Sequence, residues 1–513
     1  MRSERVIVVG AGVGGLVAAL ELAARGLEVV LVERAAKPGG KMREARIGDD
    51  RIDVGPTVLT MRWVFDELFE RVGATFDEAV GLRPVEILAR HAWSETERLD
   101  LFPQIERTAD AVGSLAGARE ARGYRLFCEQ ARRIYDTLER PFLRASRPGP
   151  LDLVRSAGWR GMADLWSIQP FSPMQRALGR YFEDPRLRQL FGRYATYVGS
   201  SPFSAPATLM LIAHVEREGV WLVEGGMQRV ADALARLAEE RGARLRYRSE
   251  ASEVISERGR AKGVVLSTGE RIEADAVVVN ADPAALAEGR FGLAAKRAVA
   301  RVSPSRRSLS ALTWAFTAEA EGFPLLRHSI FFSRDSRSEF EDLFERARMP
   351  ADPTVYVCAQ DREGSDRSRP PGPERLFCLV NAPARGDAHP FTHSEIERCT
   401  ERMFARLAGC GLKVDRSPTE TRVTTPTDFD RLFPATGGAL YGTVSHGWRA
   451  SFRRPGARTR LPGLYLAGGS THPGAGVPMA ALSGRMAAAA ILSDLASTAR
   501  SRTTATSGGT STP

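Results

Sequence analysis

The chain has 513 residues, of which 43% are hydrophobic and 26% charged, a composition typical of a globular protein. It excludes a collagen, a disordered tail protein and a disulfide scaffold, and at roughly 100–200 residues per domain it predicts about three domains, or two with one split in sequence. The net charge of +10 favours an anionic partner. Because no zinc-finger, recognition-helix or RNA-binding signature accompanies the charge, we expect no nucleic acid, and an acidic membrane surface is the better candidate.

The cysteines and the apolar runs indicate where in the cell the protein is expected. The five cysteines have no C-x-x-C spacing and are interpreted as scattered reduced thiols, and no metal-ligand spacing is found, so no metal is expected. No signal peptide is expected, because a strand pattern begins at Val6. The sequence has no run of about 18 apolar residues, so no membrane-spanning helix is expected. We therefore expect a cytoplasmic protein, soluble or peripheral at the cytoplasmic face of a membrane.

The N-terminus has the pattern of a dinucleotide-binding unit. An apolar run at 6–9 predicts a buried parallel strand, and the pattern G-x-G-x-x-G follows at 10–15. An Ala- and Leu-rich helix is expected at 16–25. A second apolar strand at 27–32 ends at Glu33. Strand, Gly turn, helix, strand and acid in this order predict a dinucleotide site.

Each position of the Gly turn has a physical role. Gly10 permits the tight strand-to-helix turn, Gly12 lets the backbone approach a pyrophosphate, and Gly15 lets helix and strand pack closely. Val13 and Gly14 of the same turn are also expected to contact the cofactor, and the dipole at the N-terminus of the following helix stabilises phosphate charge. The carboxylate that ends the second strand is placed to accept hydrogen bonds from a ribose diol, and it disfavours a 2′-phosphate and hence NADP.

Two following loops separate FAD from NAD. A Gly-Gly pair between basic residues comes directly after the acid, and a D-V-G-P-T segment follows at 53–57. Both resemble loops of the glutathione-reductase-like FAD family, in which the first runs along the flavin side of the cofactor. The resemblance implies FAD, and the cofactor contacts expected in the two loops are Arg34, Gly39, Gly40, Lys41, Gly55, Pro56 and Thr57.

The middle of the chain predicts a split domain. Residues 62–215 have mainly helical patterns, and 220–284 has the order helix, β-meander with strands from 244 to 273, and buried strand. Val254 in the meander and Asn280 after the buried strand are expected to contact the cofactor. The predicted organisation is an FAD domain in three segments at 1–75, 220–284 and 421–496, a helical or substrate region at 76–219, a substrate-binding domain at 285–420 and a disordered tail at 497–513.

The stretch from 151 to 203 is rich in both aromatic and Arg residues, with Trp159, Met162, Trp166 and Phe171 among its apolar members. Two interpretations stay open. The stretch is either ordinary helical core or a membrane-facing entrance for a lipid substrate, since apolar and basic faces together suit an interfacial helix.

The stretch 464–480 is the most informative part of the C-terminal half. A short apolar strand runs into a Gly-Gly turn and a loop, and a helix of small residues follows. This form again directs backbone dipoles at a flavin ring or its phosphates. The expected cofactor contacts here are Gly468, Gly469, Gly476, Val477 and Pro478.

Four stretches, at 10–15, 425–429, 437–442 and 467–479, resemble the bacterial carotenoid desaturases, the phytoene-desaturase-like branch of FAD enzymes with an amine-oxidase fold. Details of the last stretch, together with 483–485, look most like the 1-hydroxycarotenoid 3,4-desaturases, also called methoxyneurosporene dehydrogenases. The resemblance implies an α/β fold: a Rossmann-like FAD-binding domain of the glutathione-reductase/amine-oxidase type, a mixed α+β substrate domain and a helical membrane-associated region.

The resemblance also implies the chemistry. A hydride passes from an allylic carbon of an acyclic carotenoid to N5 of FAD, and loss of a proton from the neighbouring carbon leaves a new C=C bond. Because the chain has one dinucleotide fingerprint, electrons are expected to leave to an external acceptor, a quinone or oxygen. His472 could accept the proton, hydrogen-bond the flavin or order its own loop, and Asp428 is interpreted as a helix cap in preference to a catalytic group.

Alternative functions stay open at this stage. Within the same family the alternatives are a phytoene desaturase, a carotenoid isomerase and a ketolase. An amine oxidase of the same fold is disfavoured, because such enzymes usually frame the flavin with paired aromatics and often attach it to Cys, and neither feature is present at 465–479. The alternative outside the enzymes is a non-enzymatic flavoprotein at a membrane surface.

Overall fold

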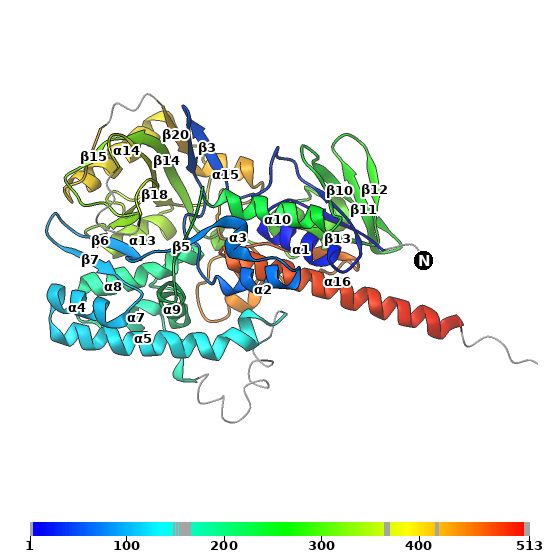
Figure 1. Cartoon of the computed structure of the whole chain (residues 1–513), viewed down its shortest axis with the longest axis horizontal. Coiled ribbons are helices and arrows are strands. Elements are labelled where there is room, and N and C mark those ends of the chain that lie inside the picture. The colour runs from blue at the N-terminus through cyan, green and yellow to red at the C-terminus, as the bar shows by residue number, and fades with distance from the viewer. Residues whose placement is uncertain are drawn as a thin grey trace, which may run out of the picture.

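The computed structural model describes residues 4–146, 149, 152, 166–363, 370–415 and 420–506. Three distant parts of the chain meet in one parallel five-stranded sheet (Figure 1). Its strands in spatial order are β21 (Leu464–Leu466), β13 (Ala276–Val279), β1 (Arg5–Val9), β2 (Glu28–Val32) and β9 (Arg244–Arg246). The central strands are continuous runs of Val, Ile and Leu because both faces of the sheet are covered.

Alternate residues of β1 pack on opposite sides. Val6 and Val8 contact the layer of α1 (Val13–Ala23), α10 (Gln228–Glu240) and α16 (Val477–Thr506). On the other face, Ile7 and Val9 join a core formed with β10 (Ala251–Glu257), β11 (Arg260–Leu266), α11 (Pro283–Ala287) and α12 (Gly292–Ala298). This layering exposes the carboxyl ends of the parallel strands at one edge.

The predicted meander is smaller than the sequence pattern indicated. The antiparallel sheet contains β10, β11 and β12 (Arg271–Glu273), whereas the strand expected at its start, β9, pairs in parallel with β2. The prediction was wrong for β9 because α10 provides a helical crossover, and a strand after such a crossover joins the same parallel sheet.

The C-terminal helix α16 packs along α1 and is longer than expected. A Cβ atom on Gly484 would lie 2.3 Å from the carbonyl oxygen of Gly14, so the two helices approach closely at this pair. By length and composition, Val477–Ser497 is the one candidate membrane span among the described residues, and 61% of its apolar window is buried against the protein. Helix α16 continues to Thr506, so 497–506 do not form the predicted disordered tail; residues 507–513 lie outside the described chain.

A second sheet of seven strands stands beside the first (Figure 1). Its order is β20 (Thr421–Thr424), β14 (Ser310–Ala318), β18 (Glu374–Ala382), β17 (Val355–Ala359), β16 (His328–Phe331), β6 (Ala89–Ala92) and β7 (Arg98–Leu101). Three of these strands differ from the expected boundaries. The segment expected to be helical contributes β6 and β7, and the segment expected to begin the third FAD portion contributes β20.

Shorter elements complete the two layers. The strands are β3 (Glu44–Ile47), β4 (Asp50–Asp53), β5 (Leu82–Pro84), β8 (Trp221–Val223), β15 (Ala320–Glu321) and β19 (Lys413–Val414). The helices and short helical turns are α2 (Trp63–Arg71), α3 (Phe76–Val80), α4 (Ile105–Ala116), α5 (Ala118–Leu138), η1 (Glu139–Leu143), α7 (Met174–Leu178), α8 (Pro185–Gly192), η2 (Arg193–Val198), η3 (Ala207–Met210), α9 (Leu211–Arg217), η4 (Pro304–Arg306), α13 (Ser336–Phe344), α14 (His393–Ala408), α15 (Pro426–Leu432) and η5 (Ser451–Arg453).

The aromatic stretch before residue 203 serves in part as core. Phe182 and Phe191 stack 4.9 Å apart and contact Phe127 of α5, and all three are buried. Trp166 and Phe171 instead have exposed fractions of 71% and 58%. Both open interpretations thus have support from different residues; Trp159 and Met162 lie outside the described residues.

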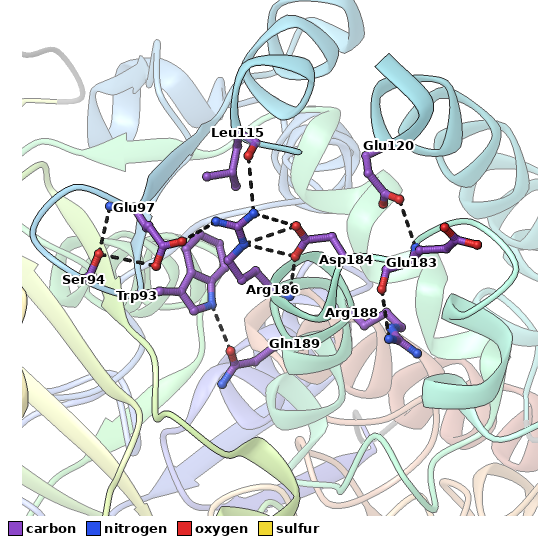
Figure 2. A network of polar contacts seen from close by, with 10 residues as sticks. All are labelled: Trp93, Ser94, Glu97, Leu115, Glu120, Glu183, Asp184, Arg186, Arg188 and Gln189. Atoms are coloured by element: carbon purple, nitrogen blue, oxygen red, sulfur yellow. Dashed lines mark hydrogen bonds and ion pairs between the residues drawn. The ribbon is translucent and has the colours of Figure 1, made fainter. Parts of the chain in front are cut away.

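A polar network fixes helix α8 to its neighbours (Figure 2). The Arg186 guanidinium donates to Asp184, the N-cap of α8, to Glu97 in the β6–β7 turn, and to the carbonyl of Leu115 at the end of α4. Gln189 of the same helix accepts from the Trp93 indole at 2.9 Å. Because α8 leads directly into η2, this network also sets the position of η2.

Candidate functional site

A cavity of about 1040 Å³ extends between the two sheets, from the carboxyl edge of the parallel sheet to the helical region. Single small-molecule pockets are typically about 300–1,000 Å³, so this volume accommodates a large cofactor or a cofactor with a substrate beside it. Residues of all three predicted FAD segments line it.

The Gly turn after β1 has the geometry that its spacing predicts. Gly10 has φ of +99°, in the left-handed region that favours glycine, and its N–H donates to the Val32 carbonyl at 2.8 Å. Gly12 is the N-cap residue of α1. A Cβ atom on Gly15 would lie 2.1 Å from the Gly10 carbonyl oxygen, so Gly15 allows helix and strand to pack closely and does not itself line the cavity.

Glu33 lies where β2 ends and lines the cavity beside this turn. One carboxylate oxygen accepts from the Ala11 N–H at 2.6 Å, and the other accepts from the Ala35 N–H at 2.7 Å. These two backbone donors hold the carboxylate at the rim of the turn. Each carboxylate oxygen has further acceptor capacity, so the group can also accept from a diol.

The second Gly pair packs directly on the first Gly turn. The Gly39 N–H donates to the Ala11 carbonyl at 2.9 Å, and a Cβ atom on Gly40 would lie 3.2 Å from the Cα atom of Gly12. Two loops that the sequence separates thus form one wall of the cavity. The wall is largely backbone, which suits close approach of a phosphate-containing ligand.

Asn280 joins the middle segment to both ends of the chain. With its amide oxygen toward the Gly turn, the side chain accepts from the Gly12 N–H at 3.1 Å and donates to the Ala467 carbonyl at 3.3 Å. A Cβ atom on Gly14 would lie 2.7 Å from the backbone nitrogen of Gly468. The N-terminal turn and the C-terminal Gly loop are therefore in direct contact.

Two cations, the buried Arg454 and the half-buried Lys41, surround the C-terminal loop together with one carboxylate. Lys41 donates to the Leu440 carbonyl, and burial lowers the pKa of its ammonium group. Arg454 donates to the carbonyls of Tyr441 and Gly469 at 3.0 and 3.3 Å, and burial lowers its pKa to about 10. Asp282 accepts from the Ser470 hydroxyl at 2.5 Å and attracts both cations.

Two members of this charged group were not predicted. Asp282 had a usable signal, since it comes just after Asn280 at the end of a buried strand. Arg454 had none: it comes from a segment of irregular structure, and only the tertiary fold brings it to the loop.

The structure brings most of the predicted cofactor residues to this cavity. Those that line it are Gly10, Gly12, Val13, Gly14, Glu33, Arg34, Gly39, Gly40, Lys41, Gly55, Pro56, Thr57, Asn280, Gly468, Gly469, Gly476, Val477 and Pro478. Val254 of β10 does not line it. This residue is 1% exposed and packs in the core, and its N–H donates to the Phe291 carbonyl. Ala251 and Ser252, earlier on the same strand, line the cavity instead.

His472 does not line the cavity either. Its imidazole is buried, with Nε2 lying 3.0 Å from the Phe142 carbonyl oxygen and 2.9 Å from that of Ala145. The ring also packs edge-on against Phe142 at 4.9 Å. Of the three roles considered for His472, this geometry supports loop ordering, because the ring faces η1 and not the cavity.

Asp428 caps helix α15. Its carboxylate accepts from the Thr425 N–H at 3.0 Å, and the Thr425 hydroxyl accepts from the Asp428 N–H at 3.3 Å. This reciprocal capping box is the structural role expected for it.

The part of the cavity beyond the Gly loops is mainly apolar. Its apolar wall comprises Leu138, Phe142, Leu143, Leu209, Leu211, Ile212, Val215, Phe377, Leu379 and Phe433. A small polar group interrupts this wall, with Thr57, Arg193, Tyr197, Glu216 and Tyr356 lining the same space. None of the last four was predicted, since they come from distant elements without a shared sequence motif.

Comparison with known proteins places these features in context. Residues 13–492 match the family described as flavin containing amine oxidoreductase. A hydroxyneurosporene desaturase of Rubrivivax gelatinosus is 55% identical, over 100% of this chain and 98% of the relative. A hydroxyneurosporene desaturase of Cereibacter sphaeroides is 47% identical, over 97% and 99% respectively.

Solved structures share the fold. An oxidoreductase from Methanosarcina mazei aligns with a TM-score of 0.61 at 17% identity, covering 94% of this chain and 99% of its own. A putrescine oxidase bound to putrescine aligns with a TM-score of 0.57 at 15% identity, covering 96% and 99%. The predicted α/β fold of the amine-oxidase type is thereby confirmed.

Proposed function

Since the chain belongs to the flavin containing amine oxidoreductase family, we propose that it is an FAD-dependent desaturase that introduces a C=C bond into an acyclic carotenoid, by 3,4-desaturation of a 1-hydroxycarotenoid. The observation that carries the proposal is a cavity that joins a dinucleotide cradle to an apolar chamber. Full-length relatives named for hydroxyneurosporene as substrate support the choice of substrate class.

The residues of the dinucleotide cradle are those that FAD binding requires. A glycine turn at a helix N-terminus, a carboxylate at the end of β2 and a second Gly loop on the first are what a dinucleotide phosphate and ribose require. In the proposal, Gly12 and Gly14 face the pyrophosphate and Glu33 binds the ribose, while the loops at 55–57 and 468–478 face the flavin. When bound, FAD supplies the two-electron acceptor that removes a hydride from carbon.

The chamber provides position and a dry environment. Its Leu, Ile, Val and Phe side chains remove the polyene from water, and burial of this kind gains about 25 cal/mol per Å² of apolar surface. Lys41 and Arg454 place positive charge at the C-terminal loop, where negative charge develops as electrons arrive. Little acid–base machinery is required, in agreement with the position of His472 outside the cavity.

Pigment analysis tests the reaction. The chain is produced in cells that accumulate phytoene, neurosporene or 1-hydroxyneurosporene, each in a separate strain, and the carotenoids are extracted. We expect a product lighter by two hydrogens from the hydroxylated substrate, with a red-shifted absorption spectrum. Isomerisation would leave the mass unchanged. Unchanged pigments in all three strains would refute the proposal.

A cofactor-free variant provides the control for these cells. In Gly12→Val the added Cβ lies 2.7 Å from the Asn280 side-chain amide, and the rest of the side chain occupies the path of the pyrophosphate. The purified variant is expected to be colourless and inactive. A yellow, active Gly12→Val protein would refute the assignment of this turn.

We further propose that the protein contacts a membrane peripherally, at the cytoplasmic face. The aromatic patch, defined as Trp166, Phe171 and Trp448, supports this: Trp166 contacts Phe171 at 5.9 Å, and Phe171 contacts Trp448 at 5.3 Å. From Trp448 the ring contacts continue through Phe452 to Phe142, which lines the cavity. In this proposal the patch is the entrance for a lipid-soluble substrate.

Vesicle binding tests this surface. With vesicles of phosphatidylcholine and phosphatidylglycerol, Trp166→Ser with Phe171→Ser is expected to reduce cosedimentation severalfold. Leu293→Ser removes a side chain of similar exposure, 60%, from α12 and is expected to bind like the wild type. Equal binding by all three proteins would contradict the assignment. The external electron acceptor, a quinone or oxygen, is a further part of the proposal, identified by which of them reoxidises the reduced protein.

A further inference from the structure

Arg193 belongs to the small polar group that interrupts the apolar wall of the cavity. It begins η2, and its guanidinium carbon lies 5.6 Å from the Tyr197 ring centroid and 5.9 Å from that of Tyr356. These distances fall within the range of cation–π contacts, about 6 Å. Among the described residues, no carboxylate lies within ion-pair distance of Arg193. The two rings thus hold the guanidinium, and the Glu216 carboxylate attracts its charge from beyond ion-pair distance.

The neighbouring hydroxyl groups are hydrogen-bonded to partners other than Arg193. The Glu216 carboxylate accepts from the hydroxyls of Tyr194 and Tyr197, the latter at 2.8 Å. The Tyr356 hydroxyl lies 2.6 Å from the Thr57 hydroxyl and 2.7 Å from His328 Nδ1. A guanidinium has five N–H donors, and the described chain offers Arg193 only the Tyr197 hydroxyl as a side-chain hydrogen-bond partner. Donors therefore remain for a ligand in the cavity.

The polar group lies next to the proposed reaction centre. Thr57 belongs to the loop that we assign to the flavin, and its hydroxyl contacts Tyr356, which in turn flanks Arg193. In a 1-hydroxycarotenoid the oxygen is three bonds from C3, one carbon–oxygen and two carbon–carbon, so with bonds of about 1.5 Å it lies within about 4 Å of the reacting carbon. Any protein group that recognises this oxygen must adjoin the flavin site, as the Arg193 group does.

We propose that Arg193, held between Tyr197 and Tyr356, donates a hydrogen bond to the C1 oxygen of the carotenoid and so selects a hydroxylated end group. The inference rests on the proposed desaturase function and adds to it the residue that determines specificity. A hydroxylated end satisfies the guanidinium, whereas a hydrocarbon end leaves buried N–H donors unpaired. Sites built to hydrogen-bond a substrate hydroxyl reject analogues that lack it by factors of about 10⁴.

Helix α8 supports this selection. The network of Arg186 and Gln189 fixes α8 to the β6–β7 turn and to α4 (Figure 2), and η2 begins at the residue after α8 ends. Gln189 also donates to the Ser333 carbonyl at 2.8 Å, which ties the helix to the segment after β16. Arg193 is therefore presented by a fixed backbone, as a specificity-determining group requires.

The test compares two substrates in Arg193→Met, whose unbranched side chain keeps the apolar stem without the donors. We expect kcat/KM for 1-hydroxyneurosporene to fall by about 10–100-fold, the loss of one charge-assisted hydrogen bond. The value for neurosporene should stay level or rise, so the preference between the two substrates collapses. Arg193→Lys, with a single ammonium, should restore part of the preference.

Arg337→Met is the matched control. Arg337 stacks 4.5 Å from the Phe203 ring, forms no ion pair with a described carboxylate and does not line the cavity. Loss of stacking energy alone would lower the stability of both Met variants and leave the substrate preference of each unchanged. Bound flavin per protein, measured by absorbance, is expected to equal the wild-type value in both.

Three results would overturn the proposal. One is an unchanged preference in Arg193→Met, and another is equal loss with both substrates. The third is loss of bound flavin in that variant, which would assign Arg193 to the cofactor. Quenching of tryptophan fluorescence by each carotenoid measures binding without turnover. If the wild type binds but desaturates neither substrate, the proposed function fails, while a preference for the hydroxylated ligand that Arg193→Met abolishes would still support the subsite.

Discussion

Gly14 contacts the C-terminal Gly loop, so adding one methyl group at Gly14 tests whether the two ends of the chain meet there. Gly14 lies in the first turn of α1, and in Gly14→Ala the new Cβ would lie 2.7 Å from the Gly468 nitrogen and 2.9 Å from its Cα atom. Ordinary contacts begin near 3.4 Å, so the loop must move by roughly 0.7 Å; two of the three nearest atoms are loop backbone, and the third belongs to the Asn280 side-chain amide, at 2.9 Å.

The expected magnitude combines two opposing effects. Alanine in place of glycine inside a helix stabilises it by about 1 kcal/mol. Overpacking against a backbone that cannot rotate away costs about 1–3 kcal/mol. We therefore expect apoprotein stability to fall by up to about 2 kcal/mol and flavin affinity to fall at least tenfold, because the displaced loop forms one wall of the cofactor cradle.

Gly113→Ala is the matched control, since Gly113 also lies inside a helix, α4. Its new Cβ would meet only the Ala121 Cβ at 3.5 Å, an ordinary contact, so the same change should stabilise the protein by about 0.5–1 kcal/mol. Urea unfolding of the apoproteins gives the stabilities, and titration with FAD followed by fluorescence gives the affinities. If Gly14→Ala behaves like Gly113→Ala in both measurements, the close approach of turn and loop is wrong.

The remaining predictions concern the cofactor carboxylate and the buried histidines. Glu33→Gln keeps the shape but loses the charge, so FAD affinity should fall by about 10–100-fold in a fluorescence titration, and an unchanged affinity would remove the ribose contact. Burial lowers the pKa of His91 and His328 from 6.5 to about 3. The unfolded chain therefore binds more protons below pH 6.5, and the free energy of unfolding should fall there by about 2 kcal/mol per histidine at pH 5. An unfolding free energy that does not change between pH 7 and pH 5 would contradict this. His472→Gln should leave the pH profile of kcat unchanged, because the imidazole lies outside the cavity. If one ionisation disappears from the pH profile of this variant, His472 has a catalytic role.

The sequence alone predicted the parts whose signals are local. The Gly turn at 10–15, the acid at Glu33 and the capping box around Asp428 are short-range patterns in which spacing determines backbone geometry. The apolar runs of β1, β13 and β21 likewise identified strands of one buried parallel sheet. These features establish the cofactor class and the fold, because each depends on residues close together in the chain.

The tertiary structure decided what depends on direction and on distant neighbours. It placed β9 in the parallel sheet, turned His472 toward η1, buried Val254 in the core and brought Arg454 to the C-terminal loop. It also placed Arg193 between two tyrosines from different elements. Such positions follow from how sheets and helices pack and from which way a side chain points, and neither is encoded in local spacing.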